Sequence, residues 1–157
     1  MNHLLAFEID NYQFGLHVPL VERVIPACEV TPVPDSPPAV LGLINIQGTI
    51  TPVLNTRMKL GLPERGVAVT DYFVIASSDK HQLALHVDSV KGLMEYTDEQ
   101  LIPIDDVLTQ KTPVSVVRIL DGLVLVYDTN KSLSETEKKH LAVALERALK
   151  ANDKGNR

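Results

Sequence analysis

Several residue types are scarce in this sequence of 157 residues, and each scarcity excludes a class of protein. Tryptophan is absent and aromatic residues make up 4% of the chain, so valine, leucine and isoleucine must build the core. The single cysteine, Cys28, cannot form an internal disulfide, which is typical of a reducing compartment. Basic residues are not in excess, because the net charge is −5, and this balance argues against binding to nucleic acid or to an anionic membrane.

Long hydrophobic runs are also missing. The longest apolar runs, such as Leu123–Tyr127, are much shorter than the roughly 20 residues that span a bilayer. The N-terminus reaches Glu8 and Asp10 without a basic stretch or a long hydrophobic one, so we expect no signal peptide and a cytoplasmic protein. With 45% hydrophobic and 22% charged residues, the composition is typical of one globular domain, or of two very small ones that share a core.

Short β-rich runs, separated by turn residues, fill the chain up to about residue 130. The pair Asp121-Gly122 lies between two apolar runs and predicts a hairpin with a type I′ turn. Helical spacing between the runs is missing, so an all-β sandwich or a pair of small barrels is favoured over a doubly wound sheet. The predicted strands are Leu4–Ile9, Gln13–Val18, Gly42–Asn45, Thr49–Leu54, Asp71–Ala76, Gln82–Val87, Val114–Ile119 and Leu123–Tyr127.

Prolines and one glycine mark the irregular part of the chain. The segment Pro32–Pro38 is rich in proline, which removes backbone donors, and it predicts a rigid loop rather than a central strand. The run Leu54–Leu60 is followed by Gly61 and predicts a single helical turn that ends at this glycine.

From Ser134 onward the hydrophobic period becomes 3.6 residues. Ser134 and Glu137 match a capping box, in which each side chain accepts a hydrogen bond from the backbone of the other residue. Leu141, Leu145 and Leu149 then fall on one face of the predicted helix. We interpret this helix as packed against the body of the protein, with partner binding as the alternative.

Two parts of the chain resemble each other. Residues 14–25 (FGLHVPLVERVI) align at a constant offset with residues 83–94 (LALHVDSVKGLM). Further pairs follow in the same order: residues 7–9 with 73–75, IQGTI (46–50) with LDGLV (120–124), and VLNT (53–56) with VYDT (126–129).

These ordered matches predict two copies of one small β unit, about residues 1–68 and 69–133, followed by a helix and tail over 134–157. One copy alone would bury little surface. We therefore expect the copies to pack together or exchange strands, as a pseudo-symmetric pair of small barrels with a groove between them.

No constellation of residues predicts catalysis. His17 and His86 occupy matching places in the repeat, but each alternates with apolar neighbours and is expected on a polar, outward face of its strand. Cys28 has no basic neighbour and is interpreted as a small buried residue. Asp105 and Asp106 are adjacent and would point to opposite sides of an extended chain. We expect no enzymatic activity, no metal and no cofactor.

Taken in order, four segments resemble the CheW family of bacterial chemotaxis coupling proteins. Family members show the same succession of a strand with glycine before a hydrophobic residue, a T-P-x-P loop, an N-x-R-G turn, and a P-V-hydrophobic-D-L-R segment. The resemblance covers about 130 of the 157 residues. Its carriers are LLAFEIDNYQFGLHVPLVERVI (4–25), TPVPDSPPAVLGLINIQGTITPVLNTRMKLGLP (31–63), YFVIASSDKHQLALHVDSVKGL (72–93) and VVRILDGLVLVYDTNKSL (116–133).

The resemblance implies a fold of two intertwined five-stranded β-barrels with a groove between them, to which the sequence adds a C-terminal α-helix. It implies a non-catalytic adaptor that couples chemoreceptors to a CheA-type histidine kinase, in chemotaxis or in a related pathway such as that of type IV pili. The implied partners are the kinase's regulatory domain, by barrel-to-barrel contact, and the cytoplasmic tip of methyl-accepting chemotaxis proteins, through the groove. The alternative is a sensor module that binds a small molecule or peptide in the same groove.

Five aliphatic residues match family positions at or near the groove, with core packing as the alternative, and three further residues match the N-x-R-G turn. In the N-x-R-G turn the family arginine contributes to receptor binding, but Gln47 stands there and lacks the fixed charge. Asn55-Thr56 likewise stands where most members have Asp-Leu. The candidate partner-binding residues are Val18, Val21, Leu43, Asn45, Ile46, Gln47, Gly48 and Val87.

Overall fold

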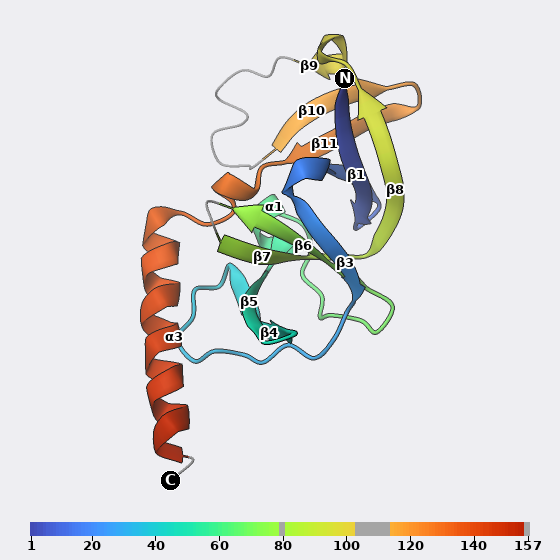
Figure 1. Cartoon of the computed structure of the whole chain (residues 1–157). Coiled ribbons are helices and arrows are strands. Elements are labelled where there is room, and N and C mark those ends of the chain that lie inside the picture. The colour runs from blue at the N-terminus through green and yellow to red at the C-terminus, as the bar shows by residue number, and fades with distance from the viewer. Residues whose placement is uncertain (79–80, 103–113, 156–157) are drawn as a thin grey trace.

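The computed structural model describes residues 1–78, 81–102 and 114–155. Two β-sheets make up most of this part of the chain, and a long helix follows them at the C-terminus (Figure 1). The all-β prediction is therefore confirmed.

The first sheet has six strands, and its neighbouring strands are antiparallel except for the parallel pair of β11 and β2. Four of its strands come from the second half of the chain. In spatial order the strands are β8 (Ser89–Tyr96), β1 (Asn2–Ile9), β2 (Tyr12–His17), β11 (Gly122–Tyr127), β10 (Val114–Ile119) and β9 (Leu101–Ile102).

The second sheet has five strands, and its one parallel pair is β5 and β7. It also takes strands from both halves of the chain. In spatial order these strands are β3 (Val21–Pro26), β6 (Tyr72–Ser78), β7 (His81–Val87), β5 (Thr49–Leu54) and β4 (Val40–Ile46).

The two sheets share one strand order. If β1, β2, β3, β4 and β5 are matched with β6, β7, β8, β10 and β11, five neighbouring strands of the first sheet follow the same order as those of the second. The parallel contacts agree residue by residue as well, since Val126 pairs with Gly15 and Val53 pairs with Ala84. Each of these pairs joins equivalent positions of the two halves.

The hairpin turns correct the repeat alignment by one residue. Gln47 and Gly48 connect β4 to β5, and their φ angles of 50° and 92° are those of a type I′ turn. Leu120 and Asp121 connect β10 to β11, and neither has a positive φ. The predicted type I′ turn at Asp121-Gly122 is therefore wrong, because Gly122 belongs to β11. Gln47 corresponds to Leu120 and not to Asp121.

Neither sheet closes into a barrel, so the expected pair of five-stranded barrels is corrected to two open sheets of six and five strands. Each sheet still curls, because residues from strands that are distant in its order meet in one small core. The core of the first sheet consists of Leu4, Tyr96, Val117, Val124 and Val126. The core of the second sheet consists of Ile44, Val53, Phe73, Ile75 and Ala84.

A third and larger core lies between the sheets. Successive side chains of a strand point to opposite faces, and β1 shows how this divides its residues. Leu5, Phe7 and Ile9 belong to the core between the sheets, whereas Leu4 belongs to the core of the first sheet. From the second sheet, residues such as Leu85 join the same cluster. We call this cluster the shared core.

The two α-helices in the described part of the chain follow their sequence signals. In α1 (Thr56–Leu60) the Asn55 side chain accepts a hydrogen bond from the Met58 N–H at 3.2 Å, and Gly61 ends the helix with a φ of 70°. The predicted single helical turn is confirmed. Three 3₁₀ turns also occur in the described residues, at Val18–Leu20, Asp98–Gln100 and Thr129–Lys131.

The C-terminal helix α3 (Glu135–Gly155) packs through its first half. Ser134 and Glu137 form the predicted capping box, with both reciprocal hydrogen bonds present. Leu141 is buried in the shared core, but Leu149 is 64% exposed. The helix therefore continues beyond the sheets that its first turns contact (Figure 1).

Candidate functional site

The candidate residues of the first half lie on two separate edges of the second sheet. Val18 is half-buried in the 3₁₀ turn Val18–Leu20, and Val21 opens β3 and packs against the shared core. The other group occupies the β4–β5 hairpin. In the sheet order β6, β7 and β5 separate β3 from β4, so the two groups are not neighbours in the sheet.

The hairpin group presents a polar tip. Leu43 and Ile46 are half-buried on β4, whereas Asn45, Gln47 and Gly48 are exposed. The Asn45 side chain accepts a hydrogen bond from the Gly48 N–H at 2.7 Å, which holds the turn. Gln47 adopts the left-handed conformation, which is unusual for a residue with a side chain, so the turn projects a neutral amide in a fixed direction.

Val87, the last of the candidate residues, does not lie on the surface. It is completely buried in the shared core, where it packs among side chains of both sheets. Its neighbour His86, whose side chain points to the opposite face of β7, is buried as well. The core packing considered as the alternative is what the structure shows for Val87.

The structure adds two residues that the sequence patterns did not single out. Leu93 on β8 is 77% exposed, and Val24 on β3 is 36% exposed. Leu93 pairs with Leu5, and Val24 pairs with Val74. Paired residues share a face of the sheet, and both buried partners belong to the shared core. Leu93 and Val24 therefore face the space between the sheets.

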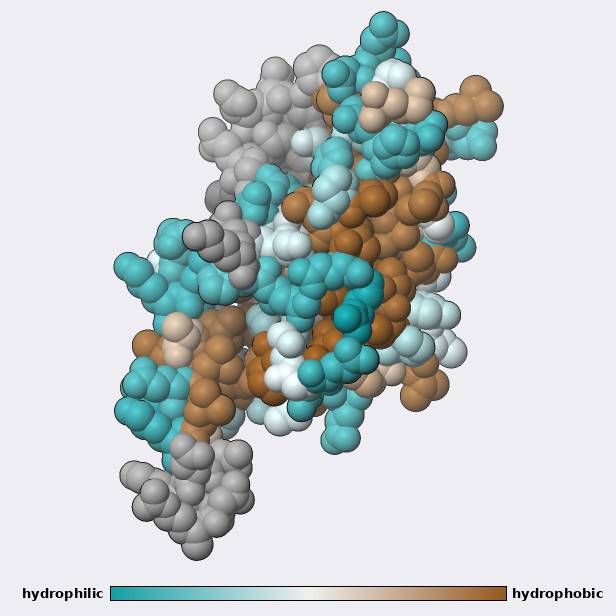
Figure 2. All heavy atoms as spheres, viewed as in Figure 1, coloured by the Kyte–Doolittle hydropathy of each residue, from teal (hydrophilic) through white to brown (hydrophobic). Residues whose placement is uncertain are grey.

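The same two residues are equivalent in the internal repeat, since the offset of 69 that aligns His17 with His86 also aligns Val24 with Leu93. Strands β3 and β8 are outer strands of their sheets. Figure 2 shows a band of hydrophobic surface over these strands. We call the strip of apolar surface bordered by Val24 and Leu93 the apolar groove, after the groove that the family resemblance implies. The aligned repeat segments already match Val24 with Leu93, but neither β3 nor β8 was among the predicted strands.

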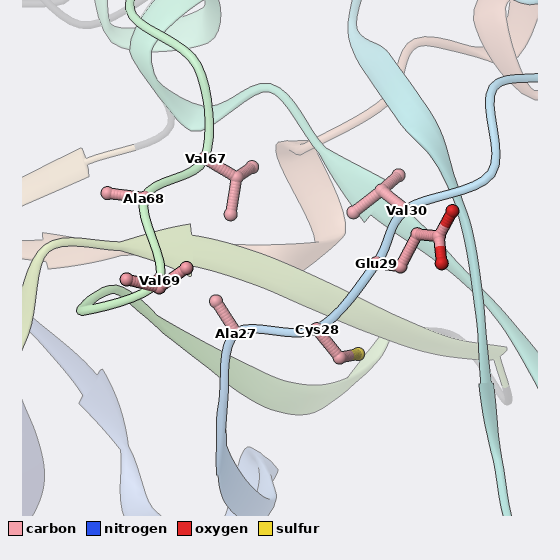
Figure 3. Close-up of a pocket in the computed structure, with 7 residues that line it drawn as sticks. All are labelled: Ala27, Cys28, Glu29, Val30, Val67, Ala68 and Val69. Carbon is pink, nitrogen blue, oxygen red and sulfur yellow. The ribbon is translucent and has the colours of Figure 1, made fainter.

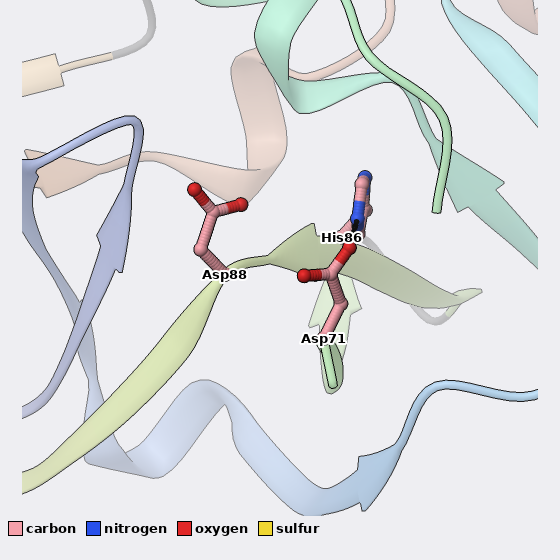
Figure 4. A group of neighbouring side chains, drawn as sticks. All are labelled: Asp71, His86 and Asp88. Carbon is pink, nitrogen blue, oxygen red and sulfur yellow. Dashed lines mark hydrogen bonds and ion pairs between the residues drawn. The ribbon is translucent and has the colours of Figure 1, made fainter. Parts of the chain in front are cut away.

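A cluster of charged residues lies beside the shared core. His86 and Asp71 are buried, and His86 Nε2 lies 2.7 Å from Asp71 Oδ2 (Figure 4). Arg65 donates two hydrogen bonds to Asp71, at 2.8 and 2.9 Å, and a third to Asp88 at 2.8 Å. Arg57 donates to both oxygens of Asp88 at 2.6 Å. These five side chains form one ion-pair network.

The outward position expected for His86 is wrong. Its side chain does lie on the opposite face from its apolar neighbours, as strand alternation requires. That face is also covered, because β7 lies between the shared core and the core of the second sheet, where His86 meets Phe73 edge-on. His17, the equivalent residue, is half-buried beside Tyr96, at 3.4 Å between His17 Nε2 and the hydroxyl, and it is not part of the network.

Asp71, His86 and Asp88 together offer the ligand types of a metal site, with ligand atoms within 4.8 Å of one another. The carboxylates are already occupied, since Arg65 binds both oxygens of Asp71 and Arg57 binds both oxygens of Asp88. A cation would have to displace two guanidinium groups that carry its own sign of charge. The arrangement favours structural ion pairing over metal binding.

The network holds its carboxylates in the ionised form. Burial by itself raises the pKa of Asp71, but hydrogen bonds from Arg65, from the Ala68 N–H and from His86 outweigh it and keep the pKa far below its usual range. The same balance of burial against donated hydrogen bonds lowers the pKa of Asp88. Both carboxylates therefore stabilise the folded chain at neutral pH, and this contribution is lost as acid protonates them.

Cys28 is exposed, so its interpretation as a buried residue is wrong. It lines an open cavity of about 390 Å³ between two extended segments, Ala27–Val30 and Val67–Val69. Figure 3 shows Ala27, Val30 and Val67 reaching into this space, whereas the Cys28 thiol and the Glu29 carboxylate point away from it. The cavity thus lacks the converging polar groups with which a protein fixes a small ligand.

Two further expectations concern the rest of the chain. Asp105 and Asp106 lie outside the described residues. Among the residues that the structure describes, no helix is long and apolar enough to cross a membrane.

Comparison with known proteins places these features in a family. The family profile described as the CheW-like domain matches residues 3–137, which include both sheets. The chain belongs to the CheW-like domain family. Chemotaxis protein CheW of Thermotoga maritima is 32% identical over 135 residues, covering 84% of this chain and 87% of that protein. Probable chemotaxis protein CheW of Rhizobium etli is 24% identical over 137 residues, covering 85% and 88%.

A solved structure gives the same CheW-like fold. The scaffolding protein TtCheW from Thermoanaerobacter tengcongensis superposes with a TM-score of 0.77 at 20% sequence identity, and the match covers 87% of this chain and 90% of that one. Most of helix α3 lies beyond the residues matched by the CheW-like profile.

The ion-pair network predicts how the stability of this CheW-like domain depends on pH. The folded pKa values of Asp71 and Asp88 lie below the unfolded value of about 3.9, so the free energy of unfolding should fall as the pH drops from about 5 to 3. Replacing Asp71→Asn removes the negative charge that Arg65 and the buried His86 contact and should cost roughly 2–4 kcal/mol at pH 7. The free energy of unfolding of the variant should also fall less steeply as the pH is lowered. Urea unfolding at a series of pH values measures both effects.

Glu95→Gln is the matched control, because Glu95 is exposed and pairs only with the exposed His3 among the described residues. It should leave both the stability at pH 7 and the slope toward acid nearly unchanged. An Asp71→Asn variant with the slope of the wild type would contradict the role of the network.

Proposed function

We propose that this protein is a non-catalytic adaptor that couples chemoreceptors to a CheA-type histidine kinase in a bacterial chemosensory pathway. Its place would be the cytoplasm, where it joins receptor arrays at the membrane. The receptor's cytoplasmic tip would enter the apolar groove, and the kinase's regulatory domain would contact a different surface. The output, whether flagellar or pilus-based, follows from the partners and not from this chain alone.

The observation that carries the proposal is the apolar groove. Monomeric proteins rarely leave large aliphatic side chains in register on facing edges, and exposed apolar patches of this kind mark interaction sites. Leu93 and Val24 border this surface from the two sheets, and Leu20 and Val21, just before Val24 in the chain, are partly buried against the shared core. An amphipathic receptor helix could place its apolar residues along such a strip.

The charged residues support binding rather than catalysis. A catalytic site needs a titratable group that is free to exchange a proton with a substrate. In the described part of the chain, the strongest cluster of titratable groups is the network around Asp71 and Asp88, and its carboxylates are held by Arg57 and Arg65. This arrangement is what a rigid scaffold requires.

The alternative sensor function has less support. A sensor for a small molecule needs an enclosed pocket with polar groups that fix the ligand. The cavity beside Cys28 is open and apolar, and it lies between loops rather than between the sheets. The groove itself presents aliphatic side chains, which suit a protein surface.

We also propose that residues 1–68 and 69–133 are two copies of one structural unit, with residues 134–157 as an appended helix and tail. The equal strand order of the two sheets supports this division. In this arrangement the groove lies between equivalent outer strands, β3 of one copy and β8 of the other, so both copies contribute to receptor binding.

Replacing Leu93→Ser should weaken receptor binding. The side chain is 77% exposed, so its loss should barely affect folding. Burying a leucine at an interface contributes roughly 1.5–3 kcal/mol, which corresponds to a loss of affinity of about tenfold or more. Calorimetric titration with a receptor-tip fragment measures the change.

The matched control is Leu149→Ser, which removes a leucine that is 64% exposed on α3. This variant should bind the receptor fragment as the wild type does. Equal affinities of Leu93→Ser and wild type would remove the groove from the receptor interface, and a titration of wild type without any heat of binding would contradict the adaptor function.

A second prediction concerns the turn in which Gln47 replaces the family arginine. Gln47 is exposed, neutral and held in a left-handed conformation at the hairpin tip. A charge-assisted hydrogen bond contributes roughly 1.5–3 kcal/mol against about 1 for a neutral one. Gln47→Arg should therefore strengthen binding to a receptor tip that presents a carboxylate there, by about fivefold, and leave binding to the kinase domain unchanged.

Gln13→Arg serves as the control, because it adds the same charge at an exposed position of β2 in the other sheet. It should not change receptor affinity. If Gln47→Arg binds the receptor fragment no better than wild type, the turn lies outside the receptor interface. A large loss of kinase binding would mean that the two surfaces are assigned the wrong way round.

A further inference from the structure

Asp88 stands where the chain passes from one sheet to the other. It follows β7, which ends at Val87 in the second sheet, and precedes β8, which begins at Ser89 in the first sheet. The direction in which β8 leaves the crossover therefore depends on how this residue is held. Its side chain is about one quarter exposed, so solvent reaches only part of it.

On the side of the second sheet, two arginines hold the Asp88 carboxylate. Arg57, on the helix that follows β5, donates to both of its oxygens at 2.6 Å, and its side chain is only 3% exposed. Arg65 donates at 2.8 Å and binds Asp71 at the same time. Asp71 in turn contacts His86 of β7. The carboxylate is thus tied directly to the helix and loop beside the second sheet and, through Arg65 and Asp71, to β7.

On the side of the first sheet, the backbone holds the same residue. The Asp88 carboxylate accepts a hydrogen bond at 2.8 Å from the N–H of Asp10, in the turn between β1 and β2. The Asp88 N–H donates to the Glu8 carbonyl at 2.9 Å. One residue therefore joins the β1–β2 hairpin of the first sheet to the helix and loop of the second.

The other crossover between the sheets is built differently. The chain passes from β2 to β3 through the 3₁₀ turn Val18–Leu20, and Pro19 occupies the position that the repeat makes equivalent to Asp88. Proline has no charge and no backbone N–H. Among the described residues, the charged contacts between the sheets are thus concentrated at Asp88, whereas the first crossover is apolar.

We propose that Asp88 is a positioning residue that fixes the relative orientation of the two sheets and, through it, the width of the apolar groove. Strand β8 starts directly after Asp88 and carries Leu93, so a change at this crossover moves one border of the groove against β3. The effect on orientation is independent of the proposed function. The effect on receptor binding rests on it.

The test measures the groove directly with two spin labels. Labels are attached at Arg23→Cys on β3 and Lys91→Cys on β8, both exposed positions, after the exposed native cysteine is removed by Cys28→Ser. Pulsed electron paramagnetic resonance then gives the distribution of distances between the labels. Asp88→Asn should broaden this distribution and shift its centre by roughly 2 Å or more.

Two further variants make the result decisive. Arg65→Gln removes one of the two arginine contacts from a side chain that is 40% exposed, so it should fold and show a smaller change of the same kind. Glu95→Gln, on the same strand β8, changes a residue whose ion pair is with His3 of β1 in the same sheet, and it should keep the wild-type distribution. If Asp88→Asn does not fold, the result with Arg65→Gln decides.

The proposal is overturned if Asp88→Asn folds and keeps the wild-type distance distribution. If Asp88→Asn does not fold, an Arg65→Gln variant with the wild-type distribution overturns it. A change in Glu95→Gln as large as that in Asp88→Asn would overturn it as well. The unlabelled variants are then titrated with the receptor-tip fragment, and a loss of affinity that follows the change in distance supports the link to the groove. A changed distance with unchanged receptor affinity overturns that link. Failure of the wild type to bind contradicts the proposed function and leaves the distance result intact.

Discussion

The shared core between the two sheets is the interaction on which the rest of the structure depends. Neither sheet closes, and each has only a small core of its own, so most of the large buried side chains lie between the sheets. Because strands alternate their faces, β1 and β7 have both faces covered, one by the shared core and one by the core of their own sheet. Strands β3 and β8, which border the apolar groove, each contribute a partly buried valine, Val21 and Val90, to the rim of this core.

The two crossovers give the pseudo-symmetric fold a functional asymmetry. One carries the uncharged 3₁₀ turn Val18–Leu20. The other carries Asp88, whose contacts with Arg57 and Arg65 join the sheets. An adaptor needs both properties, an apolar surface for a partner helix and a rigid frame that keeps the surface in shape before the partner arrives.

Strong local patterns predicted much of the fold but little of the site. The strands at Thr49–Leu54 and Val114–Ile119 match their predicted bounds, because alternation and flanking turn residues specify them locally. Strands β3 and β8 were not predicted. They are partly exposed outer strands, and charged residues, proline and glycine interrupt their apolar pattern. The exposure of His86 and Val87 was misjudged because one sequence pattern cannot tell that both faces of a strand are covered. The contact of Arg57 with Asp88 joins residues 31 positions apart, which no local pattern encodes.

The central claim is that one molecule of this protein holds a receptor and a kinase at the same time. The most direct measurement is sedimentation velocity on the full chain mixed with a receptor-tip fragment and the regulatory domain of a CheA-type kinase. We predict a ternary complex that sediments faster than either binary mixture, because the proposed function assigns the receptor and the kinase to different surfaces. Mutually exclusive binding of the two partners, or no binding of either, would contradict it.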